Sequence, residues 1–475
     1  MNSAVGNQPS SSTQGESNAA LRRTHYDWVS HRRVVREKAF CPTMLSLCGS
    51  ERWLREWKSS PNRSTKRQNM TSSENTMANN GPLAGIKVLE LGQAIAGPFA
   101  AAFLAWFGAE VIKVEPPVGG DPLRNWRVLH EGTSLWWYSM ARNKKCVTLD
   151  LRVAEGQQVA RELAKRVDVV LENFRPGTLE KWGLGYEELK KENPGVILAR
   201  ISGYGQTGPN AQKPGFAAVA EAFGGLRYVT GEPERPPVRP NLSLGDSVAG
   251  LHAALGIVTA LYHRDAKGGN GQVIDVALYE SVLNLMEGTI AEFDVAGVKR
   301  EREGMRLTGI VPSGTYPCAD GAYIVIGANG DSIFRRLMKA MGRDDLANDA
   351  RLAQNDGRSR YVDEIDAVIS DWTRSHASRE AIRLLEAADV PSGPIYSAAE
   401  MVKDLHYRER GVYQEVQLPG GQSVKLPTMA PKLAGTPGGL RWIGPPLGAH
   451  NTEVYHHWLG LPAAELERLK SKGVI

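Results

Sequence analysis

Residues 86–115 read IKVLELGQAIAGPFAAAFLAWFGAEVIKVE, and this stretch decides the fold. Its two ends, 86–91 and 109–115, are short, apolar and rich in β-branched residues, which is typical of strands buried on both faces. Between them, 98–108 is an apolar helical segment in which Pro98 suits the first helical position. A strand, a helix and a second strand in this order indicate a parallel sheet covered by helices.

The rest of the first half continues this alternation. Short apolar strands separated by amphipathic helices are typical of a parallel sheet with helices on both faces. We therefore expect an α/β fold with a parallel-sheet large domain over 81–285. The further strands are predicted at 145–151, 167–174, 196–204 and 272–278, and the further helices at 154–166, 186–194 and 246–264.

The second half has a different pattern. After a linker at 286–304, we expect a smaller α+β domain at 305–410, with a strand pair in TYPCADGAYIVIGA and helices near 331–341, 362–375 and 379–388. Pro and Gly then cluster between 418 and 449, which indicates a long extended segment. Long loops are uncommon in compact domains and often form interfaces. We expect 411–475 to return to the large domain and to end in a helix near 463–472.

The positive charge of the chain is concentrated at its N-terminus. Of 57 Lys and Arg and 52 Asp and Glu, residues 1–80 hold 12 and 6, so the body is almost neutral. A neutral body gives no reason to expect a nucleic-acid partner. No run of about 18 apolar residues is present, so we expect no membrane-spanning segment. The four cysteines show no disulfide or zinc spacing, which fits a reducing compartment.

Residues 1–80 form a leader of distinct composition. Ser, Asn, Gln and Arg dominate, and the apolar residues show no sustained period. Arg-rich and Ser-rich leaders are typical of mitochondrial transit peptides, which are poor in acids. This leader is rich in Arg and Ser but only partly poor in acids, because it holds Asp27, Glu37, Glu51 and Glu56. Two alternatives stay open: a transit peptide for the mitochondrial matrix, or a disordered tail or unused upstream start on a cytoplasmic protein.

The segment NLSLGDSVAGLHAALGIVTALYHR, residues 241–264, places one acid at the first turn of an apolar helix. A helix N-terminus favours the ionised form of such a carboxylate, Asp246, by roughly 0.3–1 kcal/mol at an exposed site. An ionised carboxylate can attack an activated acyl group. The alternative is that Asp246 only caps the helix, since Asp is a favoured N-cap residue.

The first strand ends in LGQAIAGPF, residues 91–99, where two glycines let the backbone approach a ligand. Helix N–H groups beyond this turn are able to face an anion. The spacing lacks the Lys-Ser/Thr of a phosphate loop, and Ala94 breaks the GxGxxG of a dinucleotide site. Glu115 ends the second strand, which is where a dinucleotide-binding fold places the acid that binds the ribose. A nicotinamide-dependent enzyme is therefore a weak alternative interpretation of this segment. A purely structural tight turn fits these residues equally well.

Together these segments resemble the class III CoA-transferases, the CaiB/BaiF family. The matching segments run in order from about Pro82 to the C-terminus. Among them are GIKVLELGQAIAGP, GAEVIKVEPPVGGDPLR, NKKCVTLDL, VVLENFRPGTLEKWGLGYEEL, ISGYGQTGP, GDSVAGLHAALGIVTALYHR and GGNGQVIDVALYESVLNL. The resemblance implies a Rossmann-like large domain, a small α+β domain and an interlocked ring homodimer. It also implies coenzyme A as substrate, with no permanently bound cofactor and no metal.

The resemblance assigns chemistry to named residues. It makes Asp246 the nucleophile, which forms an anhydride with the acyl group of a CoA thioester. Backbone N–H groups of 92–97 become candidates for oxyanion stabilisation. Two departures stand out: Ile95 replaces a glutamine of some members, and Pro116-Pro117 follow Glu115 where some members carry arginine. The implied CoA-binding residues are Ala94, Ile95, Ala96, Leu149, Arg152, Asn173, Phe174 and Lys181.

The same superfamily contains acyl-CoA racemases, which are the alternative function. Those enzymes pair the aspartate with a histidine just past the SGYGQTGP segment, and residues 210–222 contain neither histidine nor a second aspartate. Two-base proton exchange needs a second group within reach, so transfer is favoured. The loop RLTGIVPSGTY lacks a polyglycine run of the formyl/oxalate enzymes. We therefore expect a small carboxylic acid as the second substrate, in character closest to the succinate–hydroxymethylglutarate type of dicarboxylate transferase.

Overall fold

A computed structural model describes residues 81–475, and the leader predicted at 1–80 lies outside the described residues. Its centre is a six-stranded sheet in the order β5-β2-β1-β6-β7-β8, and every pair of neighbours is parallel. The strand order reverses between β1 and β6, which is where ligands bind in open sheets of this kind. The strands are β1 (Lys87–Glu90), β2 (Glu110–Glu115), β5 (Lys144–Thr148), β6 (Val169–Glu172), β7 (Ile197–Ser202) and β8 (Val273–Ala277).

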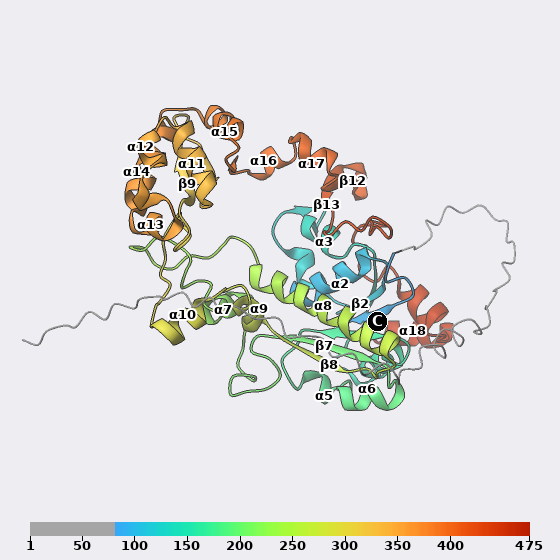
Figure 1. Cartoon of the computed structure of the whole chain (residues 1–475). Coiled ribbons are helices and arrows are strands. Elements are labelled where there is room, and N and C mark those ends of the chain that lie inside the picture. Colours follow the sequence, from blue (N-terminus) through green and yellow to red (C-terminus); the bar gives the residue numbers. More distant parts are fainter. Residues whose placement is uncertain (1–80) are drawn as a thin grey trace, which may run out of the picture. The chain divides into compact units, whose positions relative to one another are not determined.

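Successive residues along each strand belong to different hydrophobic layers. On β1, Val88 packs in one layer and Leu89 in the other, as the two-residue period of a strand requires. One layer contains residues of α2 (Ala96–Trp106), α7 (Ala217–Phe223) and α8 (Leu244–Lys267). The other contains residues of α4 (Ala154–Ala164), α5 (Thr178–Lys181), α6 (Tyr186–Glu192) and α18 (Ala463–Ser471). The labelled ribbons of this α/β arrangement are shown in Figure 1.

The predicted strands and helices of the first half are present, with ends that differ by a few residues. One expectation was wrong: Pro98 is the third residue of α2, because the helix begins at Ala96. The position is tolerated because the N–H of a third helical residue has no partner within the helix. α8 likewise begins two residues before Asp246.

The second half contains a separate three-stranded antiparallel sheet. Its order is β11-β10-β9, and its core is formed by buried residues between 311 and 390. The sequence predicts β9 (Ser313–Pro317) and β10 (Tyr323–Gly327) but not β11 (Ser392–Pro394). The helices near the predicted positions are α11 (Asp331–Ala340), α14 (Val362–Arg374) and α15 (Ser378–Ala387). The domain boundaries proposed from the sequence stay predictions.

The C-terminal segment contacts the large sheet. Its expected extended part contains β13 (Ser423–Pro427), which pairs antiparallel with β12 (Tyr413–Gln417). Further on, the Asn451 carboxamide accepts from the Thr148 N–H at 2.9 Å, and the Tyr455 hydroxyl donates to the Thr148 carbonyl at 2.8 Å. The end of the chain therefore lies against the carboxyl end of β5. The remaining short elements include α3 (Leu135–Met140), α9 (Leu278–Leu283), α10 (Thr289–Ala296) and a π-helix at Thr452–Trp458.

Helix α8 is long and apolar enough to cross a membrane by length and composition, which the sequence analysis did not anticipate. In the most apolar window of this helix, 44% is buried. Ala249, Ala253, Ile257 and Ala260 pack in the same layer as α2. The apolar character of this face is therefore explained by packing on the sheet.

Candidate active site

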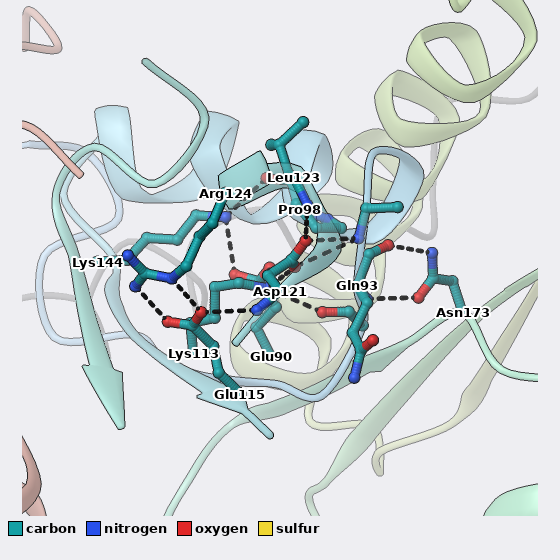
Figure 2. Close-up of polar contacts among 12 residues, drawn as sticks. Glu90, Gln93, Pro98, Lys113, Glu115, Asp121, Leu123, Arg124, Lys144 and Asn173 are labelled. Atoms are coloured by element: carbon teal, nitrogen blue, oxygen red, sulfur yellow. Dashed lines mark hydrogen bonds and ion pairs between the residues drawn. The ribbon is translucent and has the colours of Figure 1, made fainter. Parts of the chain in front are cut away.

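The loop that follows β1 is fixed by side chains from two neighbouring segments. The Asn173 side chain, just after β6, donates to the Gln93 carbonyl and accepts from the Gln93 N–H, both at 2.8 Å (Figure 2). The Ala94 N–H donates to Asp121, with distances of 3.2 and 3.3 Å to its two carboxylate oxygens. Ala94 has a φ of +63°, which is unfavourable for a residue with a Cβ. These contacts offset that strain and define the loop.

A network of buried charges lies beneath this loop (Figure 2). The Lys113 ammonium is 3.0 Å from a Glu90 oxygen and 2.8 Å from an Asp121 oxygen, and it donates to the Gly92 carbonyl at 2.9 Å. Lys144 is 2.8 Å from the second Glu90 oxygen. All four charged side chains are fully buried. Lys113 thus connects the sheet to both the loop backbone and the carboxylate that holds Ala94.

The surroundings of Lys113 set its protonation. Burial opposes its charge, but Asp121, Glu90 and Glu115 more than offset burial and raise its pKa above the usual value. Burial is also the largest influence on Lys144, and it lowers that pKa although Glu90 opposes it. Lys113 is therefore the cation that neutralises the buried acids under the loop.

Glu115 is not available to a ribose. Its two carboxylate oxygens accept from the Arg124 guanidinium at 2.7 and 2.8 Å, and the Glu115 side chain is fully buried. Arg124 also lies over the Trp137 ring, with its guanidinium carbon 3.8 Å from the ring centroid. The position at the end of β2 is thus occupied by a structural ion pair. The geometry therefore removes the observation that favoured a nicotinamide enzyme.

A cleft of about 450 Å³ opens at the carboxyl ends of the strands. This volume lies within the range of small-molecule sites. Three of the predicted CoA residues, Leu149, Arg152 and Phe174, line it together with residues that the sequence did not single out, among them Gln93 and Trp182. The Phe174 and Trp182 rings meet edge to face, with centroids 5.2 Å apart. The structure thus brings residues that follow β1, β5 and β6 to one place.

The other predicted CoA residues have different surroundings. Asn173 supports the loop, as described above. The Ile95 side chain is buried with Leu123 and Trp137, so a contact with CoA there would have to use its backbone. Lys181 is exposed at the end of α5 and does not line the cleft. Arg152 is 80% exposed, and its guanidinium pairs with Asp150 at 2.8 Å.

Helix α2 begins with free backbone donors. Within the described residues, the N–H groups of Ile95, Ala96 and Gly97 have no hydrogen-bond acceptor, as expected at a helix start. The preceding N–H groups of Gln93 and Ala94 are already used to hold the loop. Of the predicted 92–97 segment, only its helical end therefore offers donors to an anion or an oxyanion.

Helix α8 approaches this helix start closely. A Cβ at Gly250 would lie 2.8 Å from the Ala96 carbonyl oxygen and 3.0 Å from the Phe99 ring, so only glycine fits there. Asp246 precedes Gly250 by four residues and lies on the same helix face. The close contact therefore brings the face that carries Asp246 towards the start of α2.

Asp246 does not cap its helix. The N-cap of α8 is Ser243, and no hydrogen bond to the Asp246 carboxylate is present within residues 81–475. Burial and the nearby Glu221 raise the pKa of Asp246 from 3.8 to about 6, while Arg239 acts in the opposite direction. Burial therefore outweighs the favourable effect of the helix N-terminus on the ionised form. The carboxylate is still mostly ionised at neutral pH, and among the described residues it has no partner that would weaken it as a nucleophile.

Glu221, on α7, has a fully buried acidic side chain. It accepts from the Arg239 guanidinium at 2.8 and 3.1 Å and from the Gly245 N–H at 3.2 Å. Glu221 thus anchors the residue that directly precedes Asp246. Neither Glu221 nor Arg239 is predictable from the sequence, because partners that lie 18 residues apart in the chain carry no local signal.

Comparison with known proteins identifies the family. A model described as CoA-transferase family III matches residues 83–451. Succinyl-CoA–D-citramalate CoA-transferase of Chloroflexus aurantiacus is 49% identical over 395 residues, which is 83% of this chain and 98% of that relative. The alpha subunit of succinyl-CoA–L-malate CoA-transferase of Chloroflexus aurantiacus is 41% identical over 398 residues, 83% of this chain and 92% of that relative.

The solved structures agree with the sequence matches. A crystal structure of a CAIB/BAIF family protein from Brucella suis superposes with a TM-score of 0.70 at 32% identity, covering 82% of this chain and all of that one. The chain therefore belongs to CoA-transferase family III and is a CoA-transferase. The predicted family, the α/β fold and the class of enzyme are confirmed. CoA thioesters are the substrates of this class.

Proposed function

We propose that the enzyme moves CoA from succinyl-CoA to a short dicarboxylic acid through an acyl anhydride on Asp246. The names of the similar proteins support the substrates, since both act on succinyl-CoA and a hydroxylated dicarboxylic acid. The observation that carries the mechanism is the placement of a half-buried carboxylate without a hydrogen-bond partner on the α8 face that meets the start of α2. This carboxylate is mostly ionised at neutral pH, and it lies on the same face of α8 as Gly250, which approaches the start of α2.

In this mechanism, CoA is transferred in four steps. An Asp246 oxygen attacks the thioester carbonyl, the C–S bond breaks, and CoA leaves as the thiolate while an anhydride forms. The thiolate attacks the aspartyl carbonyl and releases the donor acid, which leaves an aspartyl–CoA thioester. The acceptor carboxylate attacks this thioester and forms a second anhydride. The thiolate then attacks the acceptor's acyl carbon, which gives the new acyl-CoA and restores Asp246 without a net proton.

The cleft supplies the place for CoA. Leu149, Phe174 and Trp182 provide apolar walls, and Arg152 provides a positive charge at an exposed edge. CoA held there stays beside the anhydride, so that its return is effectively intramolecular. The N–H groups of 95–97 stabilise the oxyanion that forms at each attack. Lys181 adds a phosphate contact from α5 in this proposal.

A homodimer is the second part of the proposal. The outer face of α8 carries Leu251, Leu255, Val258 and Tyr262, each between 42% and 65% exposed and spaced by three or four residues. Such a continuous apolar stripe is typical of a protein interface. In sedimentation experiments the wild type is expected to be a dimer and Leu255→Asp a monomer, whereas Val402→Asp, at an equally apolar exposed site elsewhere, stays a dimer. A monomeric wild type would contradict the proposal.

A substrate panel tests the reaction. Purified protein is incubated with succinyl-CoA and single acids, including citramalate, malate, glutarate, acetate and butyrate, and new acyl-CoA species are measured by mass spectrometry. We expect transfer to the dicarboxylic acids and none from Asp246→Ala. Transfer to monocarboxylic acids alone would reject the substrate class. Full activity of Asp246→Ala would reject the mechanism, and rapid deuterium uptake at the α-carbon of a 2-methylacyl-CoA without an acceptor would favour racemisation.

A further inference from the structure

A second hollow, of about 380 Å³, lies next to the start of α8. Its lining contains two arginines and no acid: Arg127, Arg239, Pro240, Asn241, Leu242 and Ser243. Ser243 is the N-cap of α8, three residues before Asp246. The hollow is therefore positively charged and adjoins the helix turn that carries the proposed nucleophile.

Arg127 is an exposed cation that pairs with no anion among residues 81–475. Its guanidinium carbon lies 4.2 Å from the centroid of the Trp136 ring, a stacking contact that fixes the side chain. In the described part of the chain, it makes no ion pair and no side-chain hydrogen bond. A guanidinium presents its donors in a fixed fork that matches a carboxylate. Arg127 thus offers an unsatisfied carboxylate-binding group to the hollow.

Arg239 also lines the hollow, and only part of its guanidinium is hydrogen-bonded. Its Nε and Nη2 donate to Glu221, which leaves Nη1 without an acceptor among the described residues. The side chain is 36% exposed. Because Glu221 neutralises one of the two guanidinium charges, the hollow retains the charge of Arg127 in excess. A single carboxylate would restore the balance.

We infer that this hollow binds the remote carboxylate of a dicarboxylic acyl group while the other end reacts at Asp246. The inference rests on the proposed function and names residues for its selectivity. Arg127 is the principal contact, since no other anion pairs with it in the part of the chain that the structure describes, and Arg239 contributes through Nη1. A monocarboxylic acyl group of equal length would leave Arg127 unpaired and gain nothing from the site.

The test compares two donors of equal chain length. The selectivity is the ratio of kcat/KM for succinyl-CoA to that for butyryl-CoA, with one fixed acceptor. Because a charge-assisted hydrogen bond contributes about 1.5–3 kcal/mol, Arg127→Gln is expected to reduce this ratio roughly 10- to 150-fold. The loss falls on succinyl-CoA, and butyryl-CoA is used as before. The affinity for free CoA, measured by calorimetry, stays unchanged because the CoA cleft does not include Arg127.

Arg235→Gln is the matched control, because Arg235 is exposed in the same segment as Arg239 and does not line the hollow. It should retain the wild-type ratio. If the wild type prefers succinyl-CoA and Arg127→Gln keeps that preference, the inference is wrong and the proposed function stands. If the wild type itself shows no preference for dicarboxylic groups, both are wrong. An equal loss with both donors would assign Arg127 to the general architecture of the site and overturn its role in selectivity.

Discussion

We predict that Glu221, a residue that does not touch the reacting atoms, contributes to the pH dependence of the enzyme. Burial and Glu221 together raise the pKa of Asp246 from 3.8 to about 6, with burial as the larger cause. A shift of about two units corresponds to about 3 kcal/mol between the two protonation states. Since only the ionised carboxylate attacks, kcat/KM of the wild type should fall as the pH decreases through about 6.

Glu221→Gln removes the negative charge and keeps the shape of the side chain. Its amide oxygen still accepts from Arg239 Nη2 and from the Gly245 N–H, whereas its NH2 group replaces the oxygen that accepts from Arg239 Nε. The attraction of Arg239 for Asp246 is then unopposed, while burial is unchanged. We expect the acid limb of kcat/KM to move from near pH 6 to roughly pH 5. At pH 5 the ionised fraction rises from about 0.1 to about 0.5, a roughly fivefold gain relative to each enzyme's plateau.

The assay is the rate of acyl-CoA exchange by liquid chromatography at low substrate, between pH 4.5 and 8. Glu234→Gln, which changes an exposed acid of the 230–240 segment, serves as control and should keep the wild-type limb. A limb that stays in place or moves upward in Glu221→Gln would show that this buried carboxylate does not act on the nucleophile.

Three further outcomes follow from the same structure. Asp246→Asn should be more stable than the wild type by up to about 3 kcal/mol at pH 8, because folding raises the pKa of the Asp246 carboxyl group in the wild type. About half of this gain in the free energy of unfolding should remain at pH 5. Urea unfolding that shows no gain at pH 8 would contradict this prediction. Lys113→Met leaves Asp121 buried without an ion pair among residues 81–475 and Glu90 with Lys144 alone, and should lose about 3–5 kcal/mol of stability. Lys190→Met, from an exposed pair, should unfold almost as the wild type does, and equal midpoints for the two variants would refute a structural role for the network. A chain that begins at Met77 should fold and turn over like the full chain, and loss of activity on truncation would place the leader in the fold. Residues 1–80 fused to a fluorescent reporter should direct the reporter to mitochondria if they are a transit peptide.

Much of the fold is predictable from local sequence. Strands such as 86–91 and 109–115 place apolar residues on both faces, so their pattern indicates a sheet covered by helices without any knowledge of distant contacts. β11 was missed because its three residues, Ser392–Pro394, are too short and too polar to show a period. The β12–β13 hairpin was missed for a related reason: Pro and Gly clusters around it predict an extended loop.

The candidate site was only partly predictable. Asp246 and the residues along the cleft lie in segments with family motifs, so the resemblance finds them. Lys113 and Glu90 were missed because a charge in a strand normally suggests an exposed face, whereas here both are buried and paired across neighbouring strands. Arg127 carries no motif at all, and its importance appears only once Trp136 and the hollow are seen. Contacts between distant segments decide these roles, and a single sequence does not contain them.

The most direct test of the account follows the acceptor's oxygen atoms. In the proposed mechanism one oxygen of the acceptor carboxylate remains on Asp246 when the new acyl-CoA leaves. The enzyme is therefore turned over with succinyl-CoA and an acceptor acid labelled with oxygen-18 in its carboxylates, digested, and its peptides are weighed by mass spectrometry. The account predicts oxygen-18 in the peptide that contains Asp246 and in no other peptide. CoA transfer that proceeds while Asp246 stays unlabelled would contradict it.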